Sequence, residues 1–144
     1  MPIIAPSDLS THLYAEIITE ITRGDATITT TAIDTAVQEA KMYLAKYDLV
    51  QLFGTTSASP TFTDGYLSNL VKDLATWHLL RLANPGVDNA TARTAYEDAL
   101  GVLKSIMTGQ VQPAGWPYIN TLGETTAEGD SIKWSSMHKR HNYY

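Results

Sequence analysis

The 144-residue chain contains no cysteine. That absence excludes disulfide bonds, thiol catalysis and thiolate metal sites together. Charged residues are scarce, at 17% of the chain, and 15 acidic against 10 basic residues give a net charge of −5. Because tight binding to nucleic-acid phosphates requires clustered Lys and Arg, this acidic and scattered balance argues against nucleic acid as a tightly held partner. A surface poor in charge is typical either of a Thr-rich soluble protein or of one partly covered by a partner.

Long apolar runs are also missing. No run approaches the roughly 18–20 residues of a membrane span, and the start MPIIAPSDL has neither the basic nor the apolar region of a signal peptide. We therefore expect no membrane partner and synthesis in a cytosol-like compartment. The hydrophobic fraction of 44% is ordinary for a globular protein, and the length fits one domain with a substantial core.

The stretch from Asp64 to Ala83 is predicted to be the central helix, capped by Asp64 and ended by Asn84-Pro85-Gly86. Its apolar residues extend well beyond a single stripe, so other segments should cover it on several sides. The stripe at helical spacing consists of Leu67, Leu70, Val71 and Leu74, with Trp77, Leu79, Leu80 and Leu82 beside it. The predicted narrow polar face consists of Asn69, Lys72, Asp73 and Thr76.

A first helix is predicted from a cap at Ser7 to Thr22, because apolar residues recur there every four positions. These residues are Leu9, Leu13, Ile17 and Ile21. Arg23-Gly24-Asp25 breaks the pattern and is interpreted as a turn after the helix, although it also matches the integrin-binding tripeptide.

A second helix is predicted from a cap at Thr30 or Thr31 to about Tyr47, after a β-branched connection over Ala26 to Thr31. Its predicted inward residues are Ile33, Ala36, Val37, Ala40, Tyr43, Leu44 and Tyr47, and its predicted outward residues include Asp34, Gln38, Glu39, Lys41 and Lys46. Residues 48–63 follow as a long connection, either an exposed loop at a subunit contact or a plain flexible loop.

A further helix is predicted from Ala90 to Thr108, capped by Asp88 or Asn89 and ended by Gly109. Its inward side is expected to include Tyr96, Ala99, Leu103, Ile106 and Met107, and Gly101 within it is expected to allow a tight helix crossing. Together the four helices predict an all-α fold, a small four-helix-type bundle over residues 1–109.

Residues 110–144 are predicted to form an extended C-terminal arm, because Pro and Gly punctuate them and no helical period persists. The arm carries two of the three tryptophans, whereas disordered tails are usually poor in aromatics. We expect it to become ordered against a partner, and the alternative is an arm folded back on its own domain. The predicted anchors are Trp116, Tyr118, Ile119, Trp134, Met137, Lys139, Arg140, Tyr143 and Tyr144.

The sequence contains no recognisable catalytic, metal-binding or phosphate-binding motif. The four histidines, His12, His78, His138 and His141, have no metal-site spacing, and His78 is expected to be a hydrogen-bonded core or interface residue. Neither a phosphate-binding glycine loop nor a nucleophile elbow is present. We therefore expect that the protein is not an enzyme and that it binds neither a cofactor nor a metal ion. The basic run His138–His141 suits nucleic-acid phosphates or acidic groups on a protein partner.

Four phrases of the sequence together resemble the phage head–tail connector (adaptor, or head completion) proteins, especially the Mu-like group. They are the start PSDL, the segment AIDTAVQEAKMYLAKYDL, the helix DGYLSNLVKDLATWHLLRL and the segment ARTAYEDALGVLKSIMTGQV, covering about residues 1–110. Lys46 departs from the arginine that is typical of the second phrase, and the arm is longer than expected for the group.

The resemblance implies an all-α virion protein that forms a ring, commonly a dodecamer, at the phage neck and is assembled in the host cytoplasm. It further implies a C-terminal segment bound to the portal protein, a contact with the next neck or tail-completion protein, and DNA passing through the channel without sequence-specific binding. The acidic balance suits such a channel, because carboxylates repel DNA phosphates. The alternative is a small helical regulatory module that binds a ligand or nucleic acid.

Overall fold

The structure is a computed structural model, and it describes residues 3–83 and 89–119. A 3-10 helix, η1 (Pro6–Thr11), precedes α1 (Ala15–Thr22), α2 (Ala26–Tyr43), the short α3 (Leu49–Phe53), α4 (Gly65–Ala83) and α5 (Ala90–Thr108). Across these two ranges no β-strand occurs apart from one isolated bridge between Tyr47 and Tyr118. The predicted all-α class is therefore confirmed.

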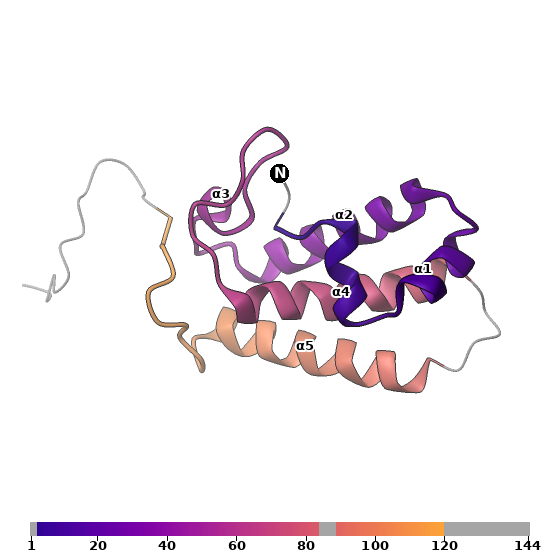
Figure 1. The fold of residues 1–144 in the computed structure, drawn as a ribbon. Coiled ribbons are helices and arrows are strands. Elements are labelled where there is room, and N and C mark those ends of the chain that lie inside the picture. Colours follow the sequence, from indigo (N-terminus) through magenta and orange to yellow (C-terminus); the bar gives the residue numbers. More distant parts are fainter. Residues whose placement is uncertain (1–2, 84–88, 120–144) are drawn as a thin grey trace, which may run out of the picture.

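Helix α4 is the centre of the fold, as predicted. It packs between α2 and α5, and η1 and α1 lie across it (Figure 1). Most of its apolar side chains are buried: Leu67, Leu70, Val71, Leu74, Ala75, Leu79 and Leu80. This coverage on several sides explains why the sequence of α4 is apolar around most of its circumference.

The Asp64 carboxylate caps α4 as predicted, accepting hydrogen bonds from the backbone N–H groups of Tyr66 at 2.8 Å and Leu67 at 3.0 Å. Thr76 was wrongly predicted to lie on the polar face of α4. This side chain is buried, and its hydroxyl has no hydrogen-bond partner within the described residues. Helical spacing places Thr76 beside Asp73, but it does not show which positions of α4 the neighbouring helices bury.

The prediction of one continuous first helix was wrong. The chain forms two helices here, η1 and α1, which are separated by residues 12–14. Leu9 is fully buried, but Ile17, two repeats of the pattern later, is 40% exposed. A 3-10 helix has three residues per turn, so the four-residue spacing does not keep one face inward across the break. The turn after α1 is confirmed: Arg23 and Gly24 have φ values of 53° and 77°, and Gly24 N–H donates to the Thr19 carbonyl at 3.1 Å.

Helix α2 begins earlier and ends earlier than predicted. The Asp25 carboxylate accepts the Thr27 N–H at 2.9 Å and starts the helix at Ala26. The threonines that suggested a connection are helical, and the hydroxyls of Thr30 and Thr31 donate to carbonyls four residues earlier. The predicted connection at 48–63 contains α3, capped by Asp48, with Leu52 and Phe53 buried.

Helix α5 has the predicted bounds, and Gly109 ends it with a φ of 82°. Asn89 lies at the N-cap position, although its side chain makes no cap hydrogen bond. Two inferences were wrong. Met107 is 49% exposed rather than inward, and nothing lies within 4 Å of where a Cβ on Gly101 would stand, so this glycine marks no tight crossing.

Candidate functional site

The chain after α5 folds back onto the end of the bundle formed by residues 44–64. The buried Tyr47 ring contacts Trp116 edge-on, with 5.4 Å between centroids, and stacks on Tyr118 at 4.9 Å. The Trp116 indole N–H donates to the Asp64 carboxylate at 2.8 Å. Backbone hydrogen bonds from Asp48 N to Pro117 O, 2.9 Å, and from Ile119 N to Lys46 O, 3.2 Å, fix the segment.

These contacts revise the predicted division of the chain after residue 109. Trp116 is only 4% exposed and belongs to the hydrophobic core, so its indole is not presented to a partner. The alternative of an arm folded back on its own domain therefore holds for residues 110–119. Tyr118 and Ile119, at 57% and 55% exposed, do face outward. The other predicted anchors lie outside the described residues: Trp134, Met137, Lys139, Arg140, Tyr143 and Tyr144.

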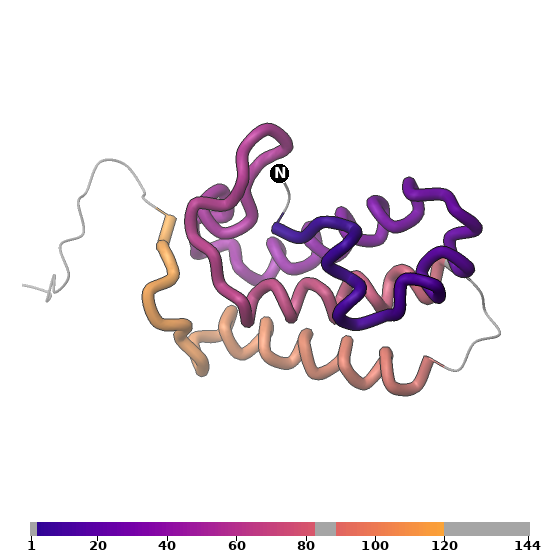
Figure 2. The backbone as a smooth tube through the Cα atoms, viewed as in Figure 1, coloured from indigo at the N-terminus to yellow at the C-terminus, as the bar shows by residue number. Residues whose placement is uncertain are grey.

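Exposed large apolar side chains gather at the two opposite ends of the helix bundle. We call the end formed by the last turns of α2 and α5, by α3, by the first turn of α4 and by residues 110–119 the aromatic end (Figures 1 and 2). Its exposed apolar residues are Met42, Val50, Tyr66, Met107, Val111, Tyr118 and Ile119. At the other end, at α1 and the last turn of α4, the exposed residues are Tyr14, Ile17 and Leu82.

A groove of about 750 Å³ lies at that second end, between α1, the second half of α4 and the first turns of α5. Its apolar lining consists of Leu13, Ile17, Ile21, Leu80, Ala92 and Ala95. Its polar lining consists of His12, Glu20, Arg23, Asp73, Thr76, Asn89 and Thr91. A concave, mainly apolar surface of this size with a few polar groups is typical of binding sites.

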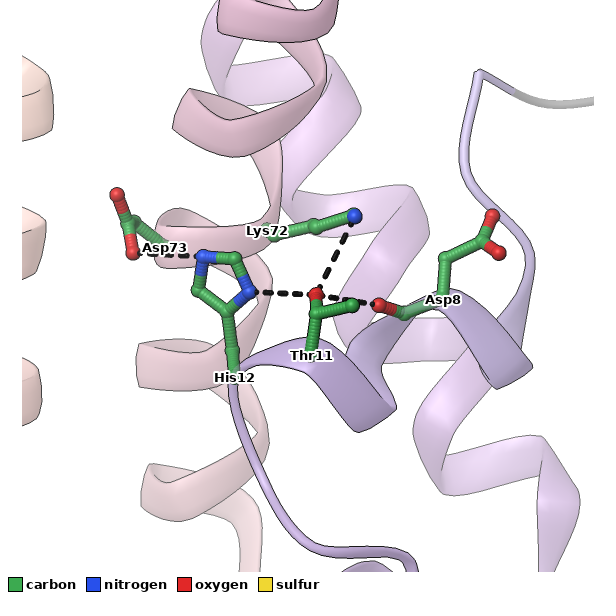
Figure 3. Close-up of polar contacts among 5 residues, drawn as sticks. All are labelled: Asp8, Thr11, His12, Lys72 and Asp73. Atoms are coloured by element: carbon green, nitrogen blue, oxygen red, sulfur yellow. Dashed lines mark hydrogen bonds and ion pairs between the residues drawn. The ribbon is translucent and has the colours of Figure 1, made fainter.

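A polar network at the edge of the groove ties η1 to α4 (Figure 3). His12 Nε2 lies 3.3 Å from the Asp73 carboxylate, and His12 Nδ1 lies 2.8 Å from the Thr11 hydroxyl oxygen. That hydroxyl donates to the Asp8 carbonyl at 2.9 Å and accepts from Lys72 Nζ at 3.3 Å.

The order Asp73, His12, Thr11 superficially matches a nucleophile with its base and orienting acid. A threonine hydroxyl has a single proton, and here it is donated to the Asp8 carbonyl. Lys72 Nζ and His12 Nδ1 contact the same hydroxyl oxygen, at 3.3 and 2.8 Å. The arrangement therefore fits a structural hydrogen-bond network that fixes η1 against α4.

The Asp73 carboxyl has a pKa above its ordinary value. Burial is the largest cause, and the negative charge of Asp98 adds to it, while His12 opposes the shift. Asp73 is thus a half-buried acid of the groove whose ionisation responds to nearby charges. A partner that brings a cation to this edge would favour its ionised form.

A second polar cluster joins the three long helices. The Glu39 carboxylate accepts from the Tyr96 hydroxyl at 2.7 Å and lies 2.7 Å from His78 Nε2. Burial and the Glu39 hydrogen bond raise the pKa of Tyr96 to about 12. His78 is therefore a hydrogen-bonded core histidine, as predicted. Glu39 was wrongly predicted to face outward, since the spacing along α2 does not reveal its partners on α4 and α5.

Among the described residues, no group of three or more His, Asp and Glu side chains is placed to hold a metal ion. In the same part of the chain, no helix is both long and apolar enough to cross a membrane. Comparison of the chain with protein-family models, with curated proteins and with solved structures found no match.

Proposed function

We propose that this chain is a structural subunit of a phage neck, forming a ring that joins the portal to the tail or to the next neck protein. One observation carries the proposal: the described core has two different exposed apolar surfaces at opposite ends of the bundle (Figure 1). A ring is built from heterologous contacts, in which each subunit uses two different patches. The sequence resemblance to connector proteins supplies the identity of the ring, and the geometry supplies patches suited to it.

The portal-docking role belongs, in this proposal, to residues 120–144. The chain reaches Ile119 on the outside of the aromatic end, and 25 residues follow. Fully extended, they would span roughly 80 Å. The segment carries Trp134, Tyr143 and Tyr144 as apolar anchors, with Lys139 and Arg140 available to pair with acidic groups of the portal. Trp116 is excluded from the anchors because the core already uses it.

The experiment compares portal binding by the full chain and by a chain that ends after Ile119. We expect the shorter chain to keep its helical circular dichroism and its melting temperature but to lose binding to the portal of the same phage. A cut after Gly109 would be ambiguous, because it also removes the Trp116 contacts with Asp64 and Tyr47.

The matched control keeps the length and charge of residues 120–144 but scrambles their order. This control should bind as weakly as the shortened chain if the anchors act through their positions. Unchanged portal binding by the chain that ends after Ile119 would contradict the proposed role of the arm.

The groove favours a second candidate function, a helical module that binds a small ligand. Its volume of about 750 Å³ and its mixture of apolar and charged lining fit a drug-sized molecule. A thermal-shift screen of the full chain against common metabolites tests this candidate. A rise in melting temperature with one compound that disappears in Ile17→Asp would support it over the connector.

A further inference from the structure

We infer that the groove between α1, α4 and α5 is the receiving half of a head-to-tail contact between copies of this chain, and that its occupant is the aromatic end of the next copy. The inference rests on the ring proposed above and specifies the surfaces that would close it. The shapes and positions of the groove and the aromatic end support it, and residues 120–144 take no part in it.

The two surfaces differ in shape. One is a groove whose apolar lining includes Leu13, Ile17 and Leu80. The other is the extended segment 117–119, which is hydrogen-bonded to residues 46–48 and lies outside the helices at the far end of the bundle (Figure 2). Its last two side chains, Tyr118 and Ile119, are more than half exposed although they are large and apolar. Large apolar residues exposed together are expected where another surface covers them.

The position of the two surfaces favours a contact between unlike ends over a pairing of like with like. A two-fold dimer would bury the same patch from both copies and leave the opposite end of each uncovered. A head-to-tail contact covers the groove of one copy and the aromatic end of its neighbour together. Since the pair then still offers a free groove on one copy and a free aromatic end on the other, the contact propagates and can close into a ring.

Charge favours the same pairing. The groove carries two carboxylates, Glu20 and Asp73, against Arg23. The aromatic end carries lysines near the ends of α2 and α5: Lys41, Lys46 and Lys104. Its carboxylates Asp48 and Asp64 accept hydrogen bonds as helix caps and keep their negative charges. Three lysines against two carboxylates leave the aromatic end with one net positive charge, and the groove has one net negative charge, a small difference that assists their association.

The test uses two full-length variants that each disable one surface. Ile17→Asp places a charge in the groove, and Ile119→Asp places one on the aromatic end. Both positions are exposed, at 40% and 55%, so neither change should prevent folding. Gln38→Asp, on the exposed side of α2, is the control that adds the same charge outside both surfaces.

Sedimentation velocity and native mass spectrometry measure the outcome up to about 1 mM, the weak end of specific association. We expect the wild type and Gln38→Asp to form oligomers, and each single variant to associate at least about tenfold more weakly. An equimolar mixture of the two variants should form a heterodimer and nothing larger, because only one intact groove and one intact aromatic end can meet.

A wild type that stays monomeric over this range, or a mixture that stays monomeric while the wild type associates, would overturn the inference. So would variants that associate as strongly as Gln38→Asp. The proposed function fails separately: a chain that associates head to tail but does not bind the portal removes the connector and leaves this interface standing. A chain that binds the portal but fails the mixing test keeps the connector function and refutes this interface.

Discussion

Replacing Trp116 tests whether residues 110–119 are part of the folded domain. The side chain is 4% exposed, contacts the Tyr47 ring and donates its indole N–H to Asp64. Burial of this kind makes a Trp→Ala change cost about 3–5 kcal/mol of unfolding free energy. Trp116→Phe retains most of the apolar contact and loses the hydrogen bond to a carboxylate, for which we expect about 1.5 kcal/mol.

The assay is urea and thermal unfolding of the full chain followed by circular dichroism at pH 7. For a domain of this size, each kcal/mol corresponds to roughly 3–5 °C in melting temperature, so Trp116→Ala should melt roughly 10–20 °C below the wild type. Tyr118→Ala is the matched control on the same segment, and because that ring is 57% exposed it should cost about 1 kcal/mol or less. A loss below about 1 kcal/mol for Trp116→Ala would refute the assignment of this segment to the core.

Three further changes probe the helices by the same assay. Gly101→Ala should stabilise the chain by about 0.5–1 kcal/mol, since the site is open and helical, and a loss of stability would reveal a hidden contact. Thr76→Val removes a buried hydroxyl that has no hydrogen-bond partner among residues 3–83 and 89–119, and it should be neutral or stabilising by up to about 1 kcal/mol, whereas Thr76→Ser should be destabilising. Burial alone would raise the pKa of Asp64, but hydrogen bonds from Trp116 and from two backbone N–H groups outweigh it and lower this pKa below 3.8. Its stabilising contribution is therefore complete above pH 4 and is lost as the pH falls through the lower folded-state value, so Asp64→Asn should flatten the dependence of stability on pH below pH 4.

Local signals predicted the helices that have strong ends. Asp64 as an N-cap and Gly109 as the residue after a helix are chemical features of single residues, and both fixed their helix ends correctly. The start of α2 was missed for a local reason too. Its threonines are β-branched and suggested a connection, but their hydroxyls bond to backbone carbonyls within the helix, and the cap at Asp25 had been assigned to the preceding turn.

Tertiary contacts account for what the sequence could not predict. Nothing in the spacing along α2 indicates that Glu39 faces Tyr96, which is 57 positions away. Likewise, the aromatic residues among the last 35 positions indicated that this segment makes contacts, but not with which surface. Trp116 contacts Asp64 and Tyr47 of its own domain. The groove combines α1, α4 and α5, so it exists only once these helices pack.

An image reconstruction of the phage particle tests the proposed ring at the phage neck most directly. We predict a ring directly beneath the portal into whose subunits the described helical core fits. In that ring, the aromatic end of each copy should lie in the groove of its neighbour, and additional density should run from Ile119 to the portal. A neck whose densities do not accommodate this core, or a chain located elsewhere than the neck, would contradict the account.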